Sequence, residues 1–466
     1  MGKGLINYLS NSAVHVQTRQ ILRRFTTGKF PHEDGTASPT MDDEESPLLG
    51  RGHRTANGSS EPNFWKHLLL DRTSSPGTKS ANPLVRLPAH IFNVTKITLL
   101  SSWINILLVF VPFGLIAGTC EWDATLVFAL NFFAIIPLAA VLSFATEEIA
   151  AKLGETLGGL VNATLGNAVE LIVSIVALRA GEVGIVQASM LGSILSNLLL
   201  VLGFCFFLGG LANMRDADGN AIEQSFSAGT AQTACSLMTL ASATMILPAA
   251  LYGVLDNKSS DGDKEEVALL LSRCSSVVLL TLYVMYLIFS LRSHKRLFES
   301  EAGPNAEEEE HDTLLGPWSA AVVLLLTTLV ISFCADHMVG SIDSVAESGA
   351  MNKTFIGLIL IPIVGNAAEH VTACVVAVKN KMDLAMGVAI GSSIQISLLV
   401  TPSLVLLGWA IGVPMTLRFE TFQTVAFAVS VLVVTYTVQD GKSNYLEGAM
   451  LLGLYGIIAL AFWASP

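Results

Sequence analysis

"TLGNAVELIVSIV" (residues 164–176) has the composition of a membrane helix, yet it carries an asparagine and a glutamate, Asn167 and Glu170, at its centre. The stretch "IVGNAAEHVTACV" (residues 363–375) repeats this pattern further along the chain. A carboxylate inside hydrocarbon is costly, so an intramembrane glutamate marks a functional site. The arrangement of these two stretches decides both the fold and the position of the site.

The composition indicates a polytopic membrane protein. Of 466 residues, 52% are hydrophobic and only 14% are charged, whereas soluble domains carry roughly 25% charged residues. The net charge of -12 comes from acids in polar loops, which does not indicate a nucleic-acid partner. The six cysteines stand singly, without CxxC or Cys/His spacing, so we expect them to be reduced.

Residues 1–95 form a polar tail that we expect to be disordered, because it cannot bury enough apolar surface to fold alone. Within it, "DEESPLLG" places Glu44 four residues before Leu48 and Leu49. This spacing resembles the acidic dileucine signals that sorting adaptors bind on vacuolar and lysosomal cargo. A plain linker is the alternative, since so short a pattern also arises by chance.

Eleven apolar stretches follow, each near the ~20 residues that a helix needs to cross a bilayer. The first stretch is 99–118, and five more lie in each of the segments 123–291 and 317–463. Their approximate spans are 99–118, 123–146, 155–179, 184–209, 226–252, 267–291, 317–341, 352–378, 384–411, 419–438 and 445–463.

The segment 292–316 is an acidic linker, with a cluster of acids at Glu307–Glu310. It joins the two halves, and a regulatory role in sensing cations is the weaker alternative. The excess of Lys and Arg on one side of the spans predicts a cytosolic N-terminus and a cytosolic linker. The sequons at Asn257 and Asn352 would then face the lumen.

A shift of 199 residues aligns the two halves without a gap. The shift places identical residues opposite one another in the two halves. They are Glu148 and Glu347, Gly166 and Gly365, Asn167 and Asn366, Glu170 and Glu369, Gly192 and Gly391, and Ser193 and Ser392. The chain therefore contains an internal duplication. Since each copy has an odd number of helices, the second copy is inverted in the membrane. The predicted fold is an all-α polytopic protein with one N-terminal helix and two inverted five-helix repeats, the architecture of secondary transporters with a midplane site.

The repeated motif predicts a cation site. Asn and Glu three residues apart share one helix face, and the preceding glycine permits close approach or local unwinding. Two such helices supply the oxygens of Glu170, Glu369, Asn167 and Asn366, with no His or Cys at matching positions. This set of hard oxygen ligands suits Ca²⁺, and Mn²⁺ could also use it.

Polar residues on the following helices extend the predicted pathway. The stretch "GSILSN" carries Ser193 and Asn197, and "GSSIQIS" carries Ser392 and Gln395. Serine in a membrane helix often bonds its own backbone. The amide side chains are costlier to bury and are the stronger candidates.

Charge predicts the mechanism. Two carboxylates are neutral with one divalent cation or with two protons, whereas the empty ionised site is strongly disfavoured in a low dielectric. Cation and protons therefore compete, which is the basis of antiport. Three further acids at the ends of the second and seventh helices are candidates for proton coupling or gating, with interfacial solvation as the alternative: Glu147, Glu148 and Glu347. His370 is either a packing residue or a proton carrier.

A family resemblance rests on these same residues. "GNAVELIVSIVAL" with "QASMLGSILSNLLLVLG", and "GNAAEHVTACVVAVKNKMDLAMGVAIGSSIQISLLVTP", resemble the paired signature repeats of the cation/proton exchangers. That family is the calcium/proton branch of the calcium/cation antiporter superfamily, and this chain is most similar to the vacuolar exchangers of fungi and plants. The resemblance covers about residues 99–463.

The resemblance implies that Glu170 and Glu369 bind Ca²⁺ and that Glu147, Glu148 and Glu347 act in proton coupling or gating. It also implies transport from the cytosol into an acidic vacuole, driven by protons, with no cofactor. A Na⁺-coupled exchanger or a Mn²⁺ carrier with the same fold is the main alternative. An ATP-driven pump is disfavoured because the chain lacks GxxxxGK[ST], and an intramembrane enzyme because it lacks HExxH.

Overall fold

The computed structural model describes residues 82–216, 219–255, 261–294, 313–349 and 351–465, nearly all of them in helices. Helices suit a bilayer because each one satisfies its own backbone hydrogen bonds. The described residues fall into two units, divided after Trp103. The dileucine pattern at Glu44, Leu48 and Leu49 and the acidic cluster Glu307–Glu310 lie outside the described residues.

The first unit contains helix α4 (Pro83–Leu100), in a part of the chain where the predicted tail extended to residue 95. The helix starts where Asn82 caps it, with the side chain accepting from the amide of Leu84 at 3.2 Å. A proline at the first helical position is compatible with this start, because its missing amide hydrogen would have no partner there. The first predicted span falls on η1 (Trp103–Val109) and α5 (Phe110–Thr119).

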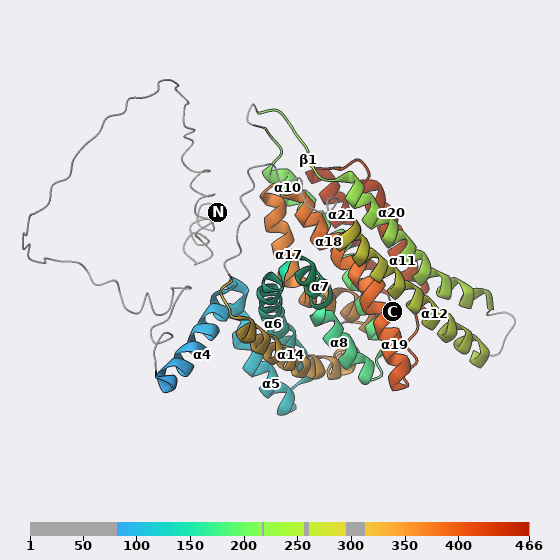
Figure 1. The fold of residues 1–466 in the computed structure, drawn as a ribbon. Helices are drawn as coiled ribbons and strands as arrows, with labels where there is room; N and C mark the ends of the chain where they lie inside the picture. The colour runs from blue at the N-terminus through green and yellow to red at the C-terminus, as the bar shows by residue number, and fades with distance from the viewer. Residues whose placement is uncertain (1–81, 217–218, 256–260, 295–312, 350, 466) are drawn as a thin grey trace, which may run out of the picture. The chain divides into compact units, whose positions relative to one another are not determined.

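The first copy of the repeat follows as a series of helices (Figure 1). They are α6 (Ala124–Lys152), α7 (Gly154–Leu165), α8 (Ala168–Arg179), α9 (Val183–Leu195), η2 (Ser196–Val201), α10 (Leu202–Ala212), α11 (Ala228–Leu255), α12 (Asp261–Ile288) and η3 (Phe289–Ser293). The short strand β1 (Gln224–Ser225) lies between α10 and α11.

The second copy has the same order of helices. They are α14 (Pro317–Gly340), α15 (Ile342–Glu347), α16 (Lys353–Phe355), η4 (Ile356–Leu360), α17 (Ile361–Val378), α18 (Met382–Gln395), η5 (Ile396–Val400), α19 (Thr401–Ile411), α20 (Thr421–Thr437) and α21 (Tyr445–Ala464). Strand β2 (Lys442–Ser443) precedes α21 and pairs antiparallel with β1.

The structure confirms a helical, multi-spanning membrane fold. Eight helices in the described part of the chain are long and apolar enough to cross a bilayer, or up to ten if each of two bent pairs is one span. Helix α20, with 17 residues, is shorter than the other candidates. The number of eleven spans therefore stays a prediction.

Hydrogen bonds between loops sort the helix ends onto two faces. On one face, Asn213 after α10 donates to the carbonyl of Val378, the last residue of α17, at 3.1 Å, and Glu148 in α6 accepts from the amide of Leu315 before α14 at 2.8 Å. We call this side the linker face, because the 292–316 linker joins helices there. On the other side, the far face, Gln187 in α9 donates to the carbonyl of Thr416 at 2.8 Å. The linker face is the side predicted to be cytosolic.

The packing of the helices follows the duplication. Helix α6 packs against α14, its counterpart, and the contact of α6 with α17 is matched by that of α14 with α8. The contact of α10 with α21 is likewise matched by that of α19 with α12. The most apolar window of α9–α10 is 72% buried, against 17% for α12. The third span of the first copy, α9–α10, therefore lies nearer the centre than α12 does.

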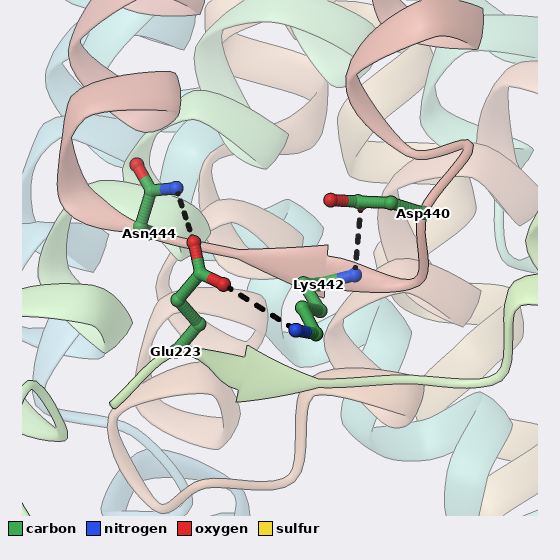
Figure 2. A network of polar contacts seen from close by, with 4 residues as sticks. All are labelled: Glu223, Asp440, Lys442 and Asn444. Atoms are coloured by element: carbon green, nitrogen blue, oxygen red, sulfur yellow. Dashed lines mark hydrogen bonds and ion pairs between the residues drawn. The ribbon is translucent and has the colours of Figure 1, made fainter. Parts of the chain in front are cut away.

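A polar network on the linker face joins the two copies (Figure 2). The carboxylate of Glu223, next to β1, accepts from Asn444 Nδ2 at 2.9 Å and pairs with Lys442 Nζ at 3.8 Å. The amide of Lys442 donates to Asp440 Oδ1 at 3.1 Å. Glu223 thus connects the loop that enters α11 with the loop that enters α21.

The sequon asparagine Asn352 has a structural role on the far face. Its Oδ1 caps α16 by accepting from the amide of Phe355 at 2.6 Å. Its Nδ2, the atom that a glycan would use, donates to the carbonyls of Phe462 and Ser465 at 2.8 Å each. Both ends of the amide are engaged, so the folded protein offers no free acceptor at this sequon.

We therefore expect Asn352→Ala to lower the free energy of unfolding by about 1–2 kcal/mol, through loss of a cap and of two further hydrogen bonds. Thr354→Ala is the matched control, because it destroys the sequon but leaves these bonds intact. Thermal unfolding in detergent measures the loss of stability in Asn352→Ala. Electrophoretic mobility before and after peptide N-glycosidase treatment shows whether Asn352 carries a glycan. A glycosidase-sensitive shift that disappears in Thr354→Ala would contradict this role.

Candidate ion-binding site

The helix that carries the first motif is broken at the motif. Helix α7 ends at Leu165, Gly166 and Asn167 form a turn, and α8 begins at Ala168, with a bend of 41° between the two parts. Glu170 therefore lies in the first turn of α8, where the helix dipole favours a negative charge. The glycine before the motif predicts this local unwinding. In the second copy α17 runs through the corresponding positions without a break.

The two motif carboxylates meet at the centre of the protein. Glu170 is buried, and its Oε1 lies so close to Gly365 that a Cβ there would be 2.7 Å away. Glu369 is partly exposed and interacts electrostatically with Glu170. Glu170 Oε1 and Glu369 Oε2 have no hydrogen-bond partner among the described residues. The carboxylates of the two motifs thus lie in one part of the protein, each with a buried oxygen available for a ligand.

The amide side chains form a chain of hydrogen bonds across three spans. Asn197 Nδ2 donates to Ser392 Oγ at 3.0 Å, and Ser392 donates to Asn167 Oδ1 at 2.8 Å. Asn167 Nδ2 in turn donates to Gln395 Oε1 at 2.6 Å. These bonds link α18 to η2 and to the break before α8, so they fix the amide of Asn167 beside the carboxylates. Asn366 is buried, and its Nδ2 has no partner among the described residues.

A cavity of about 200 Å³ reaches Glu369. It is lined by Ser143, Thr146, Glu147, Asn162, Gly166, Glu369, Thr372, Gly387, Val388, Ser392 and Gln395. These residues lie toward the end of α6, in α7, toward the end of α17 and in α18, all near the linker face. The cavity therefore gives the site access from the linker side.

The structure separates the predicted gating residues. Glu147 lines the cavity, and its charge acts on Glu369. Its neighbour Glu148 is buried and bonded to the amides of Leu314 and Leu315 at 3.2 and 2.8 Å. The other two do not line this cavity. Glu347 is exposed at the far-face end of α15, and His370 Nε2 lies 3.4 Å from Ser196 Oγ.

The predicted pathway residues also divide. Ser392 and Gln395 line the cavity. Asn197 is buried behind it and is bonded to Ser392, and Ser193 is buried with no partner for its hydroxyl among the described residues.

Sequence reasoning missed Ser143, Thr146, Asn162 and Thr372, which complete the polar wall. A position-by-position comparison of the two copies contains the signal that identifies them. The 199-residue shift places Ile342, Val345, Ile361 and Val173 opposite these four polar residues, and it places Ala346 opposite Glu147. The four apolar counterparts are 0–4% exposed. Both copies contribute polar residues to the cavity wall, and the positions related to these four by the repeat are closed by apolar packing.

Close backbone packing completes the closure on the far side. A Cβ at Gly192 of α9 would collide with the carbonyl oxygen of Leu358 in η4. The counterpart Gly391 of α18 faces open space, with no other atom within 4 Å of a Cβ placed there. The polar cavity thus lies near the linker face, whereas α9 packs closely against η4 at the corresponding place toward the far face.

The donor set can hold a hard cation. Among the described residues there is no cluster of three or more His, Cys, Asp or Glu, so a cation would depend on the two glutamates, with amide, hydroxyl and backbone oxygens. Oxygen ligands of this kind suit Ca²⁺ and Mn²⁺ rather than Zn²⁺ or Cu²⁺. A glutamate that lines a polar cavity, next to the buried glutamate of the repeated motif, is the arrangement of a membrane transporter for cations.

The chain belongs to the sodium/calcium exchanger protein family, whose model matches residues 123–292 and 319–464. It is 48% identical over 378 residues to a vacuolar calcium ion transporter of Schizosaccharomyces pombe, covering 81% of this chain and 88% of that protein. It is 37% identical over 438 residues to vacuolar cation/proton exchanger 3 of Arabidopsis thaliana, covering 93% and 92%.

A solved structure has the same fold. Native YfkE aligns with a TM-score of 0.64 and 35% identity, over 78% of this chain and 100% of YfkE. Together with the family match, this likeness confirms the resemblance to the cation/proton exchangers and the helical membrane fold.

The contact of Gly365 with Glu170 generates a prediction. We expect Gly365→Ala to weaken Ca²⁺ binding at least tenfold, about 1.4 kcal/mol, because the added methyl group displaces the Glu170 carboxylate. Calorimetric titration of purified protein with Ca²⁺ measures the change. The control is Gly184→Ala in α9, where an added Cβ meets no atom within 4 Å. Equal affinity in both variants would contradict the placement of Glu170 in the site.

Proposed function

We propose that the protein is a secondary active transporter that exchanges cytosolic Ca²⁺ for luminal protons across the vacuolar membrane. Several relatives support this assignment by name, as vacuolar calcium ion transporters, Ca²⁺/H⁺ antiporters and vacuolar cation/proton exchangers. The observation that carries the proposal is the pair Glu170 and Glu369: each has a carboxylate oxygen without a partner among the described residues, and Glu369 lines the cavity.

The chemistry of this pair requires exchange. With both groups ionised and no ligand, two negative charges face each other in a low dielectric, which is unfavourable. One Ca²⁺ neutralises both groups, and so do two protons. The site therefore crosses between the two faces in a loaded state, metallated in one direction and protonated in the other.

The cavity supports the direction of transport. It opens toward the linker face, which we place in the cytosol because Lys and Arg favour a cytosolic N-terminus. Glu147 at its wall attracts divalent cations and is well placed to pass protons between Glu369 and the solvent. Its counterpart is Ala346, so the far side has no equivalent carboxylate at this position. We assign Glu347 and His370 secondary roles in proton movement, and Glu148 a role in holding the linker.

The defining experiment is Ca²⁺ uptake into proteoliposomes that contain the purified protein and an imposed acid-inside gradient. We expect a protonophore to abolish uptake. Glu170→Gln and Glu369→Gln should each reduce it roughly 30-fold or more, since removal of one partner of a buried charge pair costs a few kcal/mol. Glu265→Gln, an exposed acid in α12, is the matched control.

The same preparation tests the competition. If Ca²⁺ displaces two protons, its apparent affinity should fall by about 100-fold for each unit by which the pH is lowered, as long as both carboxyls are protonated in the free site. Uptake that follows a Na⁺ gradient and ignores the pH gradient would favour the Na⁺-coupled alternative. Stronger uptake of Mn²⁺ than of Ca²⁺ from an equimolar mixture would favour the Mn²⁺ carrier.

Alternating access generates a further prediction. Gly192 packs against η4 toward the far face. The repeat makes Gly391 the counterpart of Gly192, and α7 the counterpart of η4. Exchange of the two conformations therefore requires Gly391 to pack against α7 when the linker side closes. Gly391→Leu should therefore leave Ca²⁺ binding unchanged, because its side chain enters open space, but should reduce transport more than tenfold. Binding is measured by calorimetry and transport in proteoliposomes, with Gly184→Leu as the control. Undiminished transport would exclude this closure.

A further inference from the structure

Two arginines lie on the far face, away from the ion site. Arg273 in α12 and Arg418, between α19 and α20, belong to neighbouring segments, because the amide of Leu417 donates to Ser272 Oγ at 2.9 Å. Each arginine therefore directly follows one partner of this hydrogen bond. The two cationic side chains belong to one region of the protein, although they are far apart in sequence.

Each guanidinium stacks on an aromatic ring. Arg273 Cζ lies 4.9 Å from the ring centre of Trp409, near the end of α19, and Arg418 Cζ lies 3.9 Å from that of Tyr252, near the end of α11. Trp and Tyr are typical of the level at which lipid headgroups meet the acyl chains. Trp409 is 58% exposed. The stacking therefore places both cations at headgroup level.

The described residues provide neither positive charge with a carboxylate counter-ion. Within the described part of the chain no carboxylate forms an ion pair with either guanidinium, and Arg273 Nε has no hydrogen-bond partner. Glu420, the acid nearest to Arg418 in sequence, accepts from Gln423 Nε2 at 3.2 Å instead. A partly buried arginine without an anionic partner is costly, so this pair of cations is suited to an anion from outside the protein.

The surface beside the arginines is apolar and faces lipid. Helix α12 is the least buried of the candidate spans. The exposed side chains on α11, α12 and α19 near the two arginines are Leu251, Val254, Leu270, Val277 and Ile411. A ligand that fits here carries negative charge at one end and hydrocarbon at the other.

We propose that Arg273 and Arg418 form a binding site for an anionic phospholipid of the far-face leaflet. The planar guanidinium groups bind the phosphate in the forked geometry that arginine offers, and Trp409 and Tyr252 hold them in place. The acyl chains lie along α11 and α12. The lipid thereby bridges α12 of the first copy and α19 of the second, independently of which ion the protein transports.

The test uses the full-length protein in detergent, with thermal unfolding as the readout. Phosphatidylserine should raise the unfolding midpoint by several degrees more than phosphatidylcholine, since a ligand stabilises the state that binds it. Arg273→Gln combined with Arg418→Gln should remove this difference. Arg179→Gln, at the far-face end of α8, is the matched control and should retain it. Equal effects of the two lipids, or an unchanged difference in the double variant, would overturn the proposal.

Inorganic phosphate distinguishes a lipid from a free anion. We expect no stabilisation by phosphate at concentrations where phosphatidylserine acts, and a matching shift with phosphate would overturn the lipid assignment. A second measurement keeps both arginines. Brominated phosphatidylserine should quench the component of tryptophan fluorescence that is lost in Trp409→Phe, more strongly than brominated phosphatidylcholine at equal mole fraction. Equal quenching by the two lipids would also contradict the site.

Discussion

Placing two carboxylates in the middle of a bilayer is the constraint on which the rest of this structure depends. Neither glutamate could remain ionised and unpartnered in hydrocarbon, so the protein surrounds them with helices, and a polar cavity reaches Glu369. The break before α8 places Glu170 at a helix N-terminus, and Gly365 makes room for its carboxylate. The amide chain from Asn197 to Gln395 then holds the surrounding helices in register.

Inversion of the repeat explains why similar sequences give different local structures. The first copy has a broken helix at its motif, whereas the second has a continuous one. Gly192 packs on backbone, whereas Gly391 faces open space. Because the copies have opposite orientations, equivalent positions lie toward opposite faces of the membrane. A local difference between the copies therefore indicates whether the face at that position is open or closed. Both copies keep a π-helical turn at the same place, η2 and η5, and this feature belongs to the scaffold in both.

The sequence predicted the duplication, the inversion and the meeting of Glu170 with Glu369, because a costly intramembrane acid that recurs at a fixed spacing indicates a site shared by two copies. It also indicated the amide residues that bond across the repeats. It did not separate Glu147 from Glu148, since one residue of helix rotation directs one side chain to the cavity and the other to the amides before α14. The sequence also did not predict the start of α4 at Pro83. The polar composition of residues 1–95 indicated a disordered tail, and a capping asparagine followed by proline is a weaker signal than composition.

The apolar counterparts of the cavity wall also affect the resting balance between the two states. When the far side opens, Ile342, Val345, Ile361 and Val173 must meet water, at about 25 cal/mol for each Å² exposed. The equivalent wall on the linker side is already polar, so its exposure to water has no comparable cost in free energy. Divergence of the two copies after duplication has therefore made the two conformations unequal in free energy. Burial of these four side chains favours the state in which the linker side is open, and every 1.4 kcal/mol of such a bias is a tenfold difference in population that ion binding must overcome.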